Sequence, residues 1–201
     1  MTANIIYSYG GSLYLNLTNK CPCSCSFCIR DRTQRVGSSE SLWLEAEPTP
    51  AQVIAGLEET DLTRYDQIVF CGFGEPFCAF ESILEISAYL RGRAGCPPIR
   101  INTNGLGDLI NQRPTAPLLE GLVDVISISL NAPDGARYRE ICNPAFGQGS
   151  FEAVLAFAAE CKKHIPQVVF SVVDVLSKEE IAACREIAAR MDIPLRVRSC
   201  S

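Results

Sequence analysis

The sequence is poor in several residue types, and each shortage excludes a class of protein. His164 is the sole histidine among 201 residues, which excludes a histidine triad and a metal site built from several histidines. Lys and Arg number 18 against 23 Asp and Glu, a formal net charge of −5, so no extended nucleic-acid surface is expected. No window approaches 18 apolar residues, so we expect no membrane span.

The amino-terminal segment MTANIIYSYGGSLYLNL lacks the charged start, the apolar run and the small-residue cleavage site of a signal peptide. We therefore expect a cytoplasmic protein with reduced thiols. A chain of this length buries roughly 70% of the surface of its unfolded form, so its core needs no disulfide or metal for stability. One domain over residues 1–201 is expected.

Cysteine, by contrast, is abundant. The chain has 11 cysteines, and four of them stand at positions 21, 23, 25 and 28 in the stretch NKCPCSCSFCIR. A disulfide framework is not expected in a chain this large without a secretion signal. Cys21, Cys25 and Cys28 form the spacing C-x3-C-x2-C. Three thiolates on one loop can bind three irons of a cubane iron–sulfur cluster and leave the fourth iron open to substrate.

Two other interpretations of this loop stay open at this point. A zinc site would use all four thiols, although zinc ligands usually come in two pairs spaced by a dozen or more residues. The thiols can also be unligated and simply packed. Cys23 lies outside the x3/x2 spacing, and we interpret it as a spectator or tuning residue rather than a ligand.

Apolar segments and amphipathic segments alternate along the chain. The predicted strands cover residues 12–18, 67–73, 99–105, 123–131, 168–176 and 194–199, and the predicted helices cover 49–59, 80–92, 117–122, 150–165 and 177–191. Six βα-type units predict a parallel sheet with right-handed crossovers. Because six strands are too few for a closed eight-stranded barrel, the expected fold is α/β, a partial (βα)6 TIM-type barrel with parallel strands.

Helix-start signals support this assignment. Thr49 and Gln52 form a predicted capping box around Pro50, and Ser177 and Glu180 form a second one. Ser150 is the predicted cap of the helix over 150–165.

The motifs resemble those of a known family. The cysteine pattern with Phe27 before its last cysteine resembles the radical S-adenosylmethionine (SAM) superfamily, and CGFGEPF (71–77) is similar to that family's Gly-Gly-Glu-Pro motif, with Phe73 in place of one glycine. SLNAPDGARYREIC (129–142) resembles the fourth-strand region of many members. The segments SLYLNLTNKCPCSCSFCIR, VFCGFGEP and RINTNG most resemble the short radical SAM proteins associated with TatD-family hydrolases, a group named for gene neighbourhood.

The resemblance implies two cofactors, a [4Fe–4S] cluster on Cys21, Cys25 and Cys28, and SAM. It implies that SAM chelates the open iron, that an electron from the cluster releases a 5′-deoxyadenosyl radical, and that this radical takes a hydrogen atom from substrate.

The resemblance also implies a set of residues that contact SAM. These are Gly72, Gly74 and Glu75 for its amino group, Phe27 for its adenine, Asn102, Asn104, Ser129 and Asn131 for its ribose and carboxylate, and Ser171 as a further contact. Each has a plainer interpretation, which is turn chemistry for the Gly-Glu-Pro motif and the asparagines and core packing for Phe27. The resemblance identifies no catalytic side chain.

Positive charge gathers beside the cysteines at Lys20, Arg30, Arg32 and Arg35. These side chains are either solvated surface, a docking site for an acidic electron donor such as flavodoxin or ferredoxin, or a site for a substrate carboxylate or phosphate.

The last predicted strand carries Arg196 and Arg198 on one face, where they could hold an anion in the barrel mouth, with Asp174 as a nearby polar group. His164 is interpreted as a cation at a helix end.

The leading hypothesis is a radical SAM enzyme of unknown substrate, with a small molecule or nucleotide favoured over a peptide or a glycyl-radical enzyme. A functional link to a TatD-family hydrolase is a further expectation from the resemblance. The alternative is a non-catalytic iron–sulfur or zinc module for electron transfer or partner binding. Release of 5′-deoxyadenosine from SAM distinguishes the two.

Overall fold

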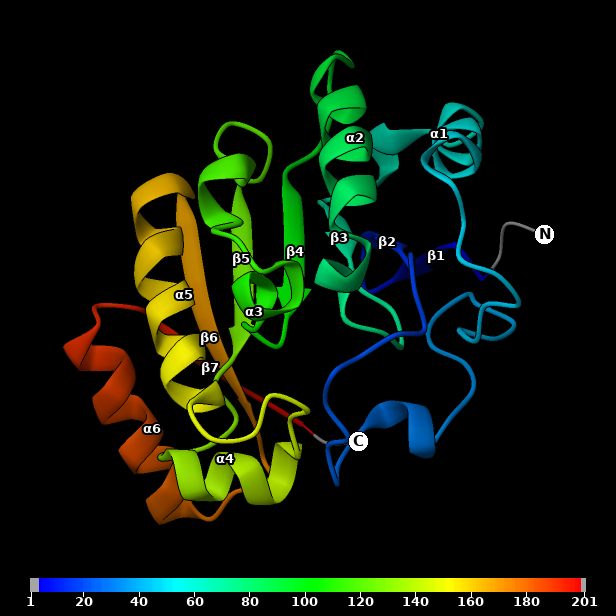
Figure 1. Cartoon of the computed structure of the whole chain (residues 1–201). Helices are drawn as coiled ribbons and strands as arrows, with labels where there is room; N and C mark the ends of the chain where they lie inside the picture. Colours follow the sequence, from blue (N-terminus) through cyan, green and yellow to red (C-terminus); the bar gives the residue numbers. More distant parts are fainter. Residues whose placement is uncertain (1–3, 200–201) are drawn as a thin grey trace.

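The computed structural model describes residues 4–199, and one curved sheet of seven strands forms its centre (Figure 1). The strands lie in the sheet in the order in which they occur along the chain: β1 (Ile6–Tyr9), β2 (Ser12–Leu15), β3 (Ile68–Phe70), β4 (Ile99–Thr103), β5 (Val125–Ser129), β6 (Gln167–Val173) and β7 (Leu195–Arg198). Strands β2 to β7 are parallel, whereas β1 runs antiparallel to β2.

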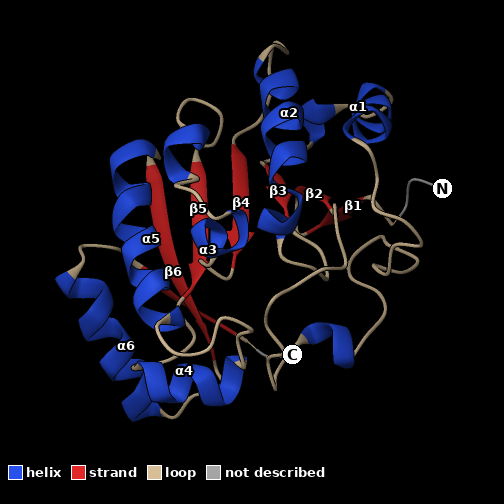
Figure 2. Ribbon diagram, in the orientation of Figure 1, coloured by secondary structure: helices blue, strands red, loops and turns tan. Residues whose placement is uncertain are grey.

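Helices connect the strands and cover the outer face of the sheet (Figure 2). They are α1 (Pro50–Glu58), α2 (Phe80–Arg91), α3 (Gly107–Asn111), α4 (Gly135–Cys142), α5 (Ser150–His164) and α6 (Lys178–Arg190). Short 3₁₀ helices lie at Ile29–Asp31, Leu62–Arg64, Pro76–Ala79 and Ala116–Leu119.

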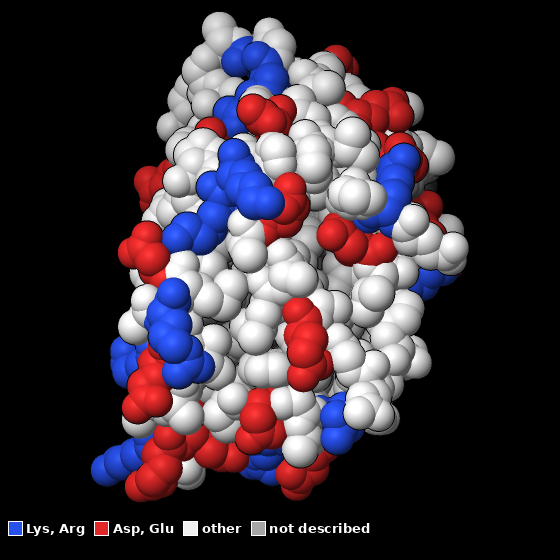
Figure 3. Space-filling view, turned by 60° about the vertical axis from the view of Figure 1, so that its left-hand side comes forward, with Lys and Arg blue, Asp and Glu red and all other residues white. Residues whose placement is uncertain are grey.

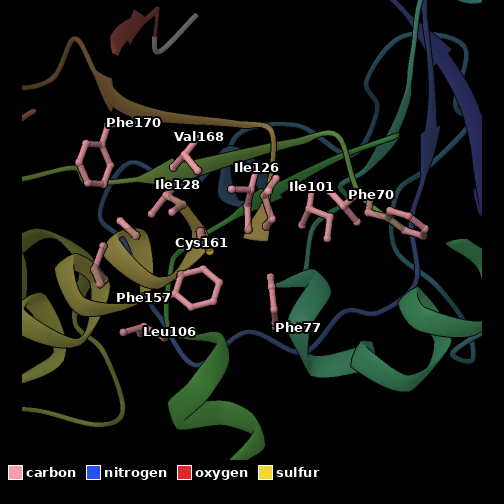
Figure 4. Packing of buried hydrophobic residues seen from close by; sticks show 14 of the residues in the cluster. Phe70, Phe77, Ile101, Leu106, Ile126, Ile128, Phe157, Cys161, Val168 and Phe170 are labelled. Atoms are coloured by element: carbon pink, nitrogen blue, oxygen red, sulfur yellow. The ribbon is translucent and has the colours of Figure 1, made fainter. Parts of the chain in front are cut away.

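The core lies between the outer face of the sheet and these helices (Figure 4). Alternate residues of neighbouring strands stand level with one another, so that Phe70 pairs with Ile101 and Ile101 with Ile126, and all three are fully buried. Phe157 of α5 meets Phe77 edge-on at 5.4 Å between ring centroids. Each such side chain contributes about 1.5–3 kcal/mol on burial, which makes this layer the main source of stability.

The α/β class and the parallel order of the main strands are confirmed. The prediction missed β1, which makes the sheet seven-stranded and adds one antiparallel pair. Gly10 and Gly11 both adopt positive φ, 54° and 79°, and a two-residue turn of this kind closes a tight hairpin. The short strand before this turn is only partly buried, so it shows no long apolar run.

Other boundaries also differ from the prediction. Helices α3 and α4 were not predicted, and the expected helix over 117–122 is the 3₁₀ turn Ala116–Leu119. The capping boxes at Thr49 and Ser177 are both present. The prediction for Ser150 is wrong, because Gly149 occupies the cap position of α5 and the Ser150 hydroxyl donates to the Gly147 carbonyl at 2.8 Å.

Candidate metal and cofactor site

The cysteine loop, residues 19–28, leaves β2 at the carboxyl edge of the sheet and docks on the end of α4 (Figure 1). The Ser24 N–H donates to the Cys142 carbonyl at 3.1 Å, and the Ser26 N–H donates to the Ile141 carbonyl at 2.9 Å. Carbonyls left unpaired at a helix end are natural acceptors for such donors. The loop is therefore held in place by backbone bonds to a segment more than 110 residues away in the chain.

Helix α4 is the element that sequence reasoning missed at this site. Asp134 caps it by accepting from the Arg137 N–H at 2.8 Å, and Asn143 ends it in the left-handed region. The signal was present, because Tyr138, Ile141 and Cys142 recur at helical spacing after an Asp cap.

The thiols of the loop lie close enough to influence one another. Cys21 and Cys25 both raise the pKa of Cys23, and the Cys25 thiol lies 3.8 Å from the Cys142 carbonyl oxygen. Within residues 4–199, no three His, Cys, Asp or Glu side chains are placed to hold a single metal ion. A [4Fe–4S] cluster takes thiolates at separate irons, so the donor set suits it.

Hydrogen bonds divide these thiols into donors and acceptors. The hydrogen bond from Cys23 lowers the pKa of Cys21 to about 7, and those with Cys142 and Cys23 lower the pKa of Cys25 to about 4. The same bonds raise the pKa of Cys23 and of Cys142. Burial raises the pKa of Cys28. Because the thiolate is the form that binds metal, the lowered pKa values suit Cys21 and Cys25 as ligands, whereas the raised pKa of Cys28 does not distinguish it from Cys23.

The loop that follows β3 approaches the cysteine loop so closely that two of its positions have no room for a side chain. A Cβ on Gly74 would lie 2.3 Å from the Thr18 carbonyl oxygen and 2.7 Å from that of Lys20. A Cβ on Gly72 would lie 1.8 Å from Asn16 Oδ1. Gly74 lies against backbone atoms and Gly72 against the Asn16 side chain, so both glycines also serve the packing of the protein itself.

Phe73 stands between these glycines, and its side chain lies apart from the cysteines. It is 5% exposed and packs with Tyr7 and Leu42 in a second apolar cluster, and Trp43 meets it edge-on at 5.2 Å. The bulky side chain of Phe73 is thus buried in this second apolar cluster, away from the thiols.

Glu75 is buried, at 4% exposure, and joins the loops after β3 and β4. Its carboxylate accepts from Thr103 Oγ1 at 2.6 Å, from the Asn104 N–H at 2.7 Å and from the Phe77 N–H at 3.2 Å. Burial raises the pKa of Glu75 to about 8, and these hydrogen bonds oppose the shift. The residue predicted to contact SAM therefore also fixes the geometry of the carboxyl edge.

Two more of the residues predicted to contact SAM lie on or after β4, at different distances from the cysteine loop. Asn104 lies beside the cysteine loop, where its amide donates to Cys23 Sγ at 3.7 Å. Asn102 lies lower, on the inner face of β4, and accepts from Arg100 Nε at 2.8 Å. Phe27 is partly buried and packs against the main core.

The predicted residues on and after β5 and β6 also differ in their distance from the cysteine loop. Asn131 is 6% exposed and donates to Cys142 Sγ at 3.8 Å, while its buried Oδ1 has no hydrogen-bond partner. An unpaired buried acceptor beside the cysteine loop suits a ligand that carries N–H or O–H groups. Ser129 and Ser171 face each other in register lower on the inner face, where Ser129 Oγ accepts from Arg198 at 3.3 Å.

The positive charge beside the loop is partly paired. Lys20 forms an ion pair of 2.9 Å with Glu47, which also accepts from Thr18 Oγ1 at 2.5 Å. Arg30 reaches the Cys23 carbonyl at 3.5 Å. Sequence reasoning did not find Glu47, which is distant in the chain and belongs to no motif.

Two surface hollows lie elsewhere. One is lined by Tyr7, Ser38 and Thr60 beside the β1–β2 hairpin, and the other by Gln167 and Pro194 at the amino ends of β6 and β7. Neither of these two hollows includes a residue of the cysteine loop. No helix in the described part of the chain has the length and apolar character needed to cross a membrane.

A family-wide comparison agrees with this geometry. The sequence profile of the radical SAM superfamily matches residues 15–191, which include the cysteine loop and every predicted SAM contact. The chain belongs to the radical SAM superfamily. Enzymes of this superfamily use a [4Fe–4S] cluster and SAM, so the predicted pair of cofactors is confirmed at the level of the family.

Curated relatives cover part of the chain. It is 29% identical over 147 residues to the radical SAM protein GTP 3′,8-cyclase 2 of Mycobacterium tuberculosis and of Mycobacterium bovis. The match takes in 70% of this chain but 37% of the relative, so the chain spans little more than a third of the length of these relatives.

Solved structures of other radical SAM proteins share the fold. HydG, a maturase of the [FeFe]-hydrogenase, has a TM-score of 0.66 at 14% identity, covering 94% of this chain and 42% of its own. SuiB of Streptococcus suis bound to S-adenosylmethionine has a TM-score of 0.62 at 14% identity, covering 95% and 38%. A radical SAM methyltransferase from Sphaerobacter thermophilus has a TM-score of 0.52 at 19% identity, covering 96% and 68%. These radical SAM likenesses confirm the partial barrel.

Proposed function

We propose that this chain is a single radical SAM core domain in which Cys21, Cys25 and Cys28 hold the [4Fe–4S] cluster. One observation carries the assignment. The loop with the x3/x2 spacing is held by α4 at the carboxyl edge of a parallel sheet, where ligands of such folds bind. When bound, the cluster supplies the electron that cleaves SAM to methionine and a 5′-deoxyadenosyl radical, which abstracts hydrogen from substrate.

The surrounding residues position the cofactors. Backbone carbonyls around Gly72 and Gly74, together with Glu75, accept from the SAM amino group, a role that suits acceptors facing an ammonium-like donor. The unpaired Oδ1 of Asn131 accepts from the SAM amino or ribose groups. Cys23 donates its thiol proton to neighbouring sulfur and thereby adjusts the electron density of the ligands.

The remaining predicted contacts lie around these. Asn104 stands at the loop, Phe27 beside it for the adenine, and Asn102, Ser129 and Ser171 below on the inner face for the ribose and carboxylate.

The substrate we favour is a small molecule or nucleotide. The likeness to proteins named as cyclases of GTP supports a nucleotide, within the third of their length that this chain spans. The electron comes from an acidic donor such as flavodoxin or ferredoxin, for which Lys20 and Arg30 offer positive charge beside the loop. A functional link to a TatD-family hydrolase rests on the resemblance of the motifs alone. A cytoplasmic location rests on the missing signal-peptide features of the amino-terminal segment.

The test uses anaerobically reconstituted protein, reduced with dithionite and given SAM, with 5′-deoxyadenosine and methionine measured by mass spectrometry. Cys25→Ala is the loss variant and Cys23→Ala is its matched control on the same loop. We expect wild type and Cys23→Ala to load four irons and form product, whereas Cys25→Ala loses both. A fully loaded four-iron wild type that forms no product contradicts the proposed function, and equal losses in both variants contradict the ligand assignment.

A further inference from the structure

Three arginines lie on the inner face of the sheet, opposite the apolar core. Arg100 stands on β4 between Ile99 and Ile101, which are buried in the core, so its own side chain points to the other face. Arg196 and Arg198 alternate along β7, and Arg196 stands level with Ser171 of β6 on this same face. The expectation that both arginines of β7 share one face is therefore confirmed.

These arginines have no carboxylate partner among residues 4–199. The ion pairs of the described part all use other cations, such as Arg91 with Asp124 and Arg137 with Glu180. Arg100 donates to the Asn102 amide oxygen, and Arg198 donates to the Ser129 hydroxyl, and both acceptors are neutral. The buried Nε of Arg198 has no hydrogen-bond partner at all.

The arrangement is electrostatically unfavourable without a further group. Burial lowers the pKa of Arg100 and of Arg198, and the charge of Arg196 lowers both further. Like charges repel more strongly in a medium of low dielectric constant, and burying a charge without a partner costs free energy. On the face shown in Figure 3, Lys and Arg lie among Asp and Glu side chains. The three arginines differ from that face because no carboxylate of the described residues pairs with them.

Two of the three arginines lie close to the loop after β3. Arg100, Arg198 and Glu75 all act electrostatically on Cys71 at the start of that loop. Arg100 donates to Asn102, two residues closer to the carboxyl edge, so its side chain leans toward that edge. An anion held here lies on the floor of the partial barrel beneath the cysteine loop.

We propose that Arg100, Arg196 and Arg198 bind an anionic group of the substrate, a carboxylate or a phosphate. Guanidinium groups suit both, because their planar N–H donors match two oxygens at once. Asn102 and Ser129 act as positioning residues that hold Arg100 and Arg198 in place. The anion anchors one end of the substrate, and the end that loses hydrogen faces the cysteine loop. The assignment of the anion to a substrate rests on the proposed function, whereas the anion site itself is argued from the arginines alone.

The test measures anion binding by isothermal titration calorimetry on the reconstituted protein with SAM and without reductant. The probes are glycerol 2-phosphate and glutarate, each at constant ionic strength, so that the two arms separate phosphate from carboxylate recognition. We expect at least one probe to bind, and Arg100→Gln, Arg196→Gln and Arg198→Gln to weaken it about tenfold or more, as loss of a charged hydrogen bond implies. Arg190→Gln, on the exposed end of α6, serves as the matched control and leaves binding unchanged.

Arg196 has an exposed side chain, so its variant is expected to fold even if Arg198→Gln does not, and circular dichroism with thermal unfolding checks each one. The inference is overturned if neither probe binds the wild type. It is also overturned if folded Arg196→Gln and folded Arg100→Gln both bind a probe with wild-type affinity. The proposed function is judged separately by 5′-deoxyadenosine. Product without anion binding refutes this inference alone, and arginine-dependent binding without product refutes the proposed function alone.

Discussion

Gly74 shows how a single residue sets the approach of two loops. Its substitution by alanine places a Cβ against the Thr18 and Lys20 carbonyls, which are backbone atoms and cannot rotate away. We expect Gly74→Ala to lower the free energy of unfolding by about 1–3 kcal/mol and to reduce iron loading, since the cysteine loop must shift. Urea unfolding and iron content measure the two effects.

Gly92→Ala is the matched control for this change. Gly92 has negative φ, and its added Cβ would meet the nearest atom at 3.4 Å, an ordinary contact. We expect near-normal stability and iron loading in Gly92→Ala. If Gly74→Ala behaves like Gly92→Ala, the close approach of the loops is not a constraint in solution.

Glu75 is a second position where one side chain governs several backbone groups. In Glu75→Gln, the amide nitrogen cannot accept from the Asn104 N–H, so one buried donor loses its partner. Leaving a buried donor unpaired costs about 1–3 kcal/mol, and we expect a loss of stability of that size in urea unfolding. A variant as stable as wild type would falsify the structural role given to Glu75.

The pH dependence of this effect has a definite sign. The folded pKa of Glu75, about 8, lies above the reference value of 4.5, so the folded state holds a proton that the unfolded state has lost. Its contribution to stability is fully present below pH 4.5 and is lost as pH rises through 8. The stability difference between wild type and Glu75→Gln should therefore shrink between about pH 5 and pH 9. A difference that grows over this range contradicts burial as the dominant cause.

At the scale of elements, His164 links the end of α5 to the 3₁₀ turn Ala116–Leu119. Its Nδ1 lies 2.8 Å from Glu120 Oε2 and its Nε2 lies 3.2 Å from Glu160 Oε1. The hydrogen bond with Glu120, and then that with Glu160, raise the pKa of His164 above its ordinary value. The stabilisation is therefore present below the unfolded pKa of about 6.5 and is lost as pH rises through the folded pKa.

We expect His164→Gln to be less stable than wild type at about pH 5.5 and equal to it at about pH 9, by urea unfolding. Lys163→Gln is the control, because Lys163 also pairs with Glu160 but keeps its charge over this range. A destabilisation of His164→Gln that is equal at both pH values would show that packing, rather than charge, explains the role of the histidine.

Helices with local start signals were the predictable parts of the fold. Helices α1 and α6 carry capping boxes within four residues, and such local signals survive in the folded protein. Helix α4 was missed although its Asp134 cap and the spacing of its apolar residues are local signals. Strand β1 was missed because it has four residues and is only partly buried, so it shows no long apolar run.

At the scale of the whole molecule, cofactor binding should stabilise the fold as well as supply chemistry. A ligand at 100 times its Kd stabilises the state that binds it by about 2.7 kcal/mol, which corresponds to about 5–10 °C in Tm for a chain of this size. We expect SAM to raise the Tm of the iron-loaded protein by this amount under anaerobic conditions. Cys25→Ala, which lacks one cluster ligand, should show no shift, and an equal shift in both proteins would place SAM away from the cluster.

The sequence by itself determined the chemistry and the order of the main elements. The spacing of Cys21, Cys25 and Cys28, the Gly-Glu-Pro motif and the alternation of strands with helices are local features, and local features can be read along a chain. From them come the family, its two cofactors and the parallel sheet, all of which the comparisons confirm.

Only the tertiary structure decided which of these residues meet. It brings Cys142 and Asn131 to the cysteine loop, assigns Cys23 the role of donor, and gathers Arg100 with Arg196 and Arg198 on one face. These residues are separated by many tens of positions, and their contacts arise because parallel pairing places distant strands side by side. The packing of the sheet, rather than any local pattern, therefore decides which of these side chains lie together.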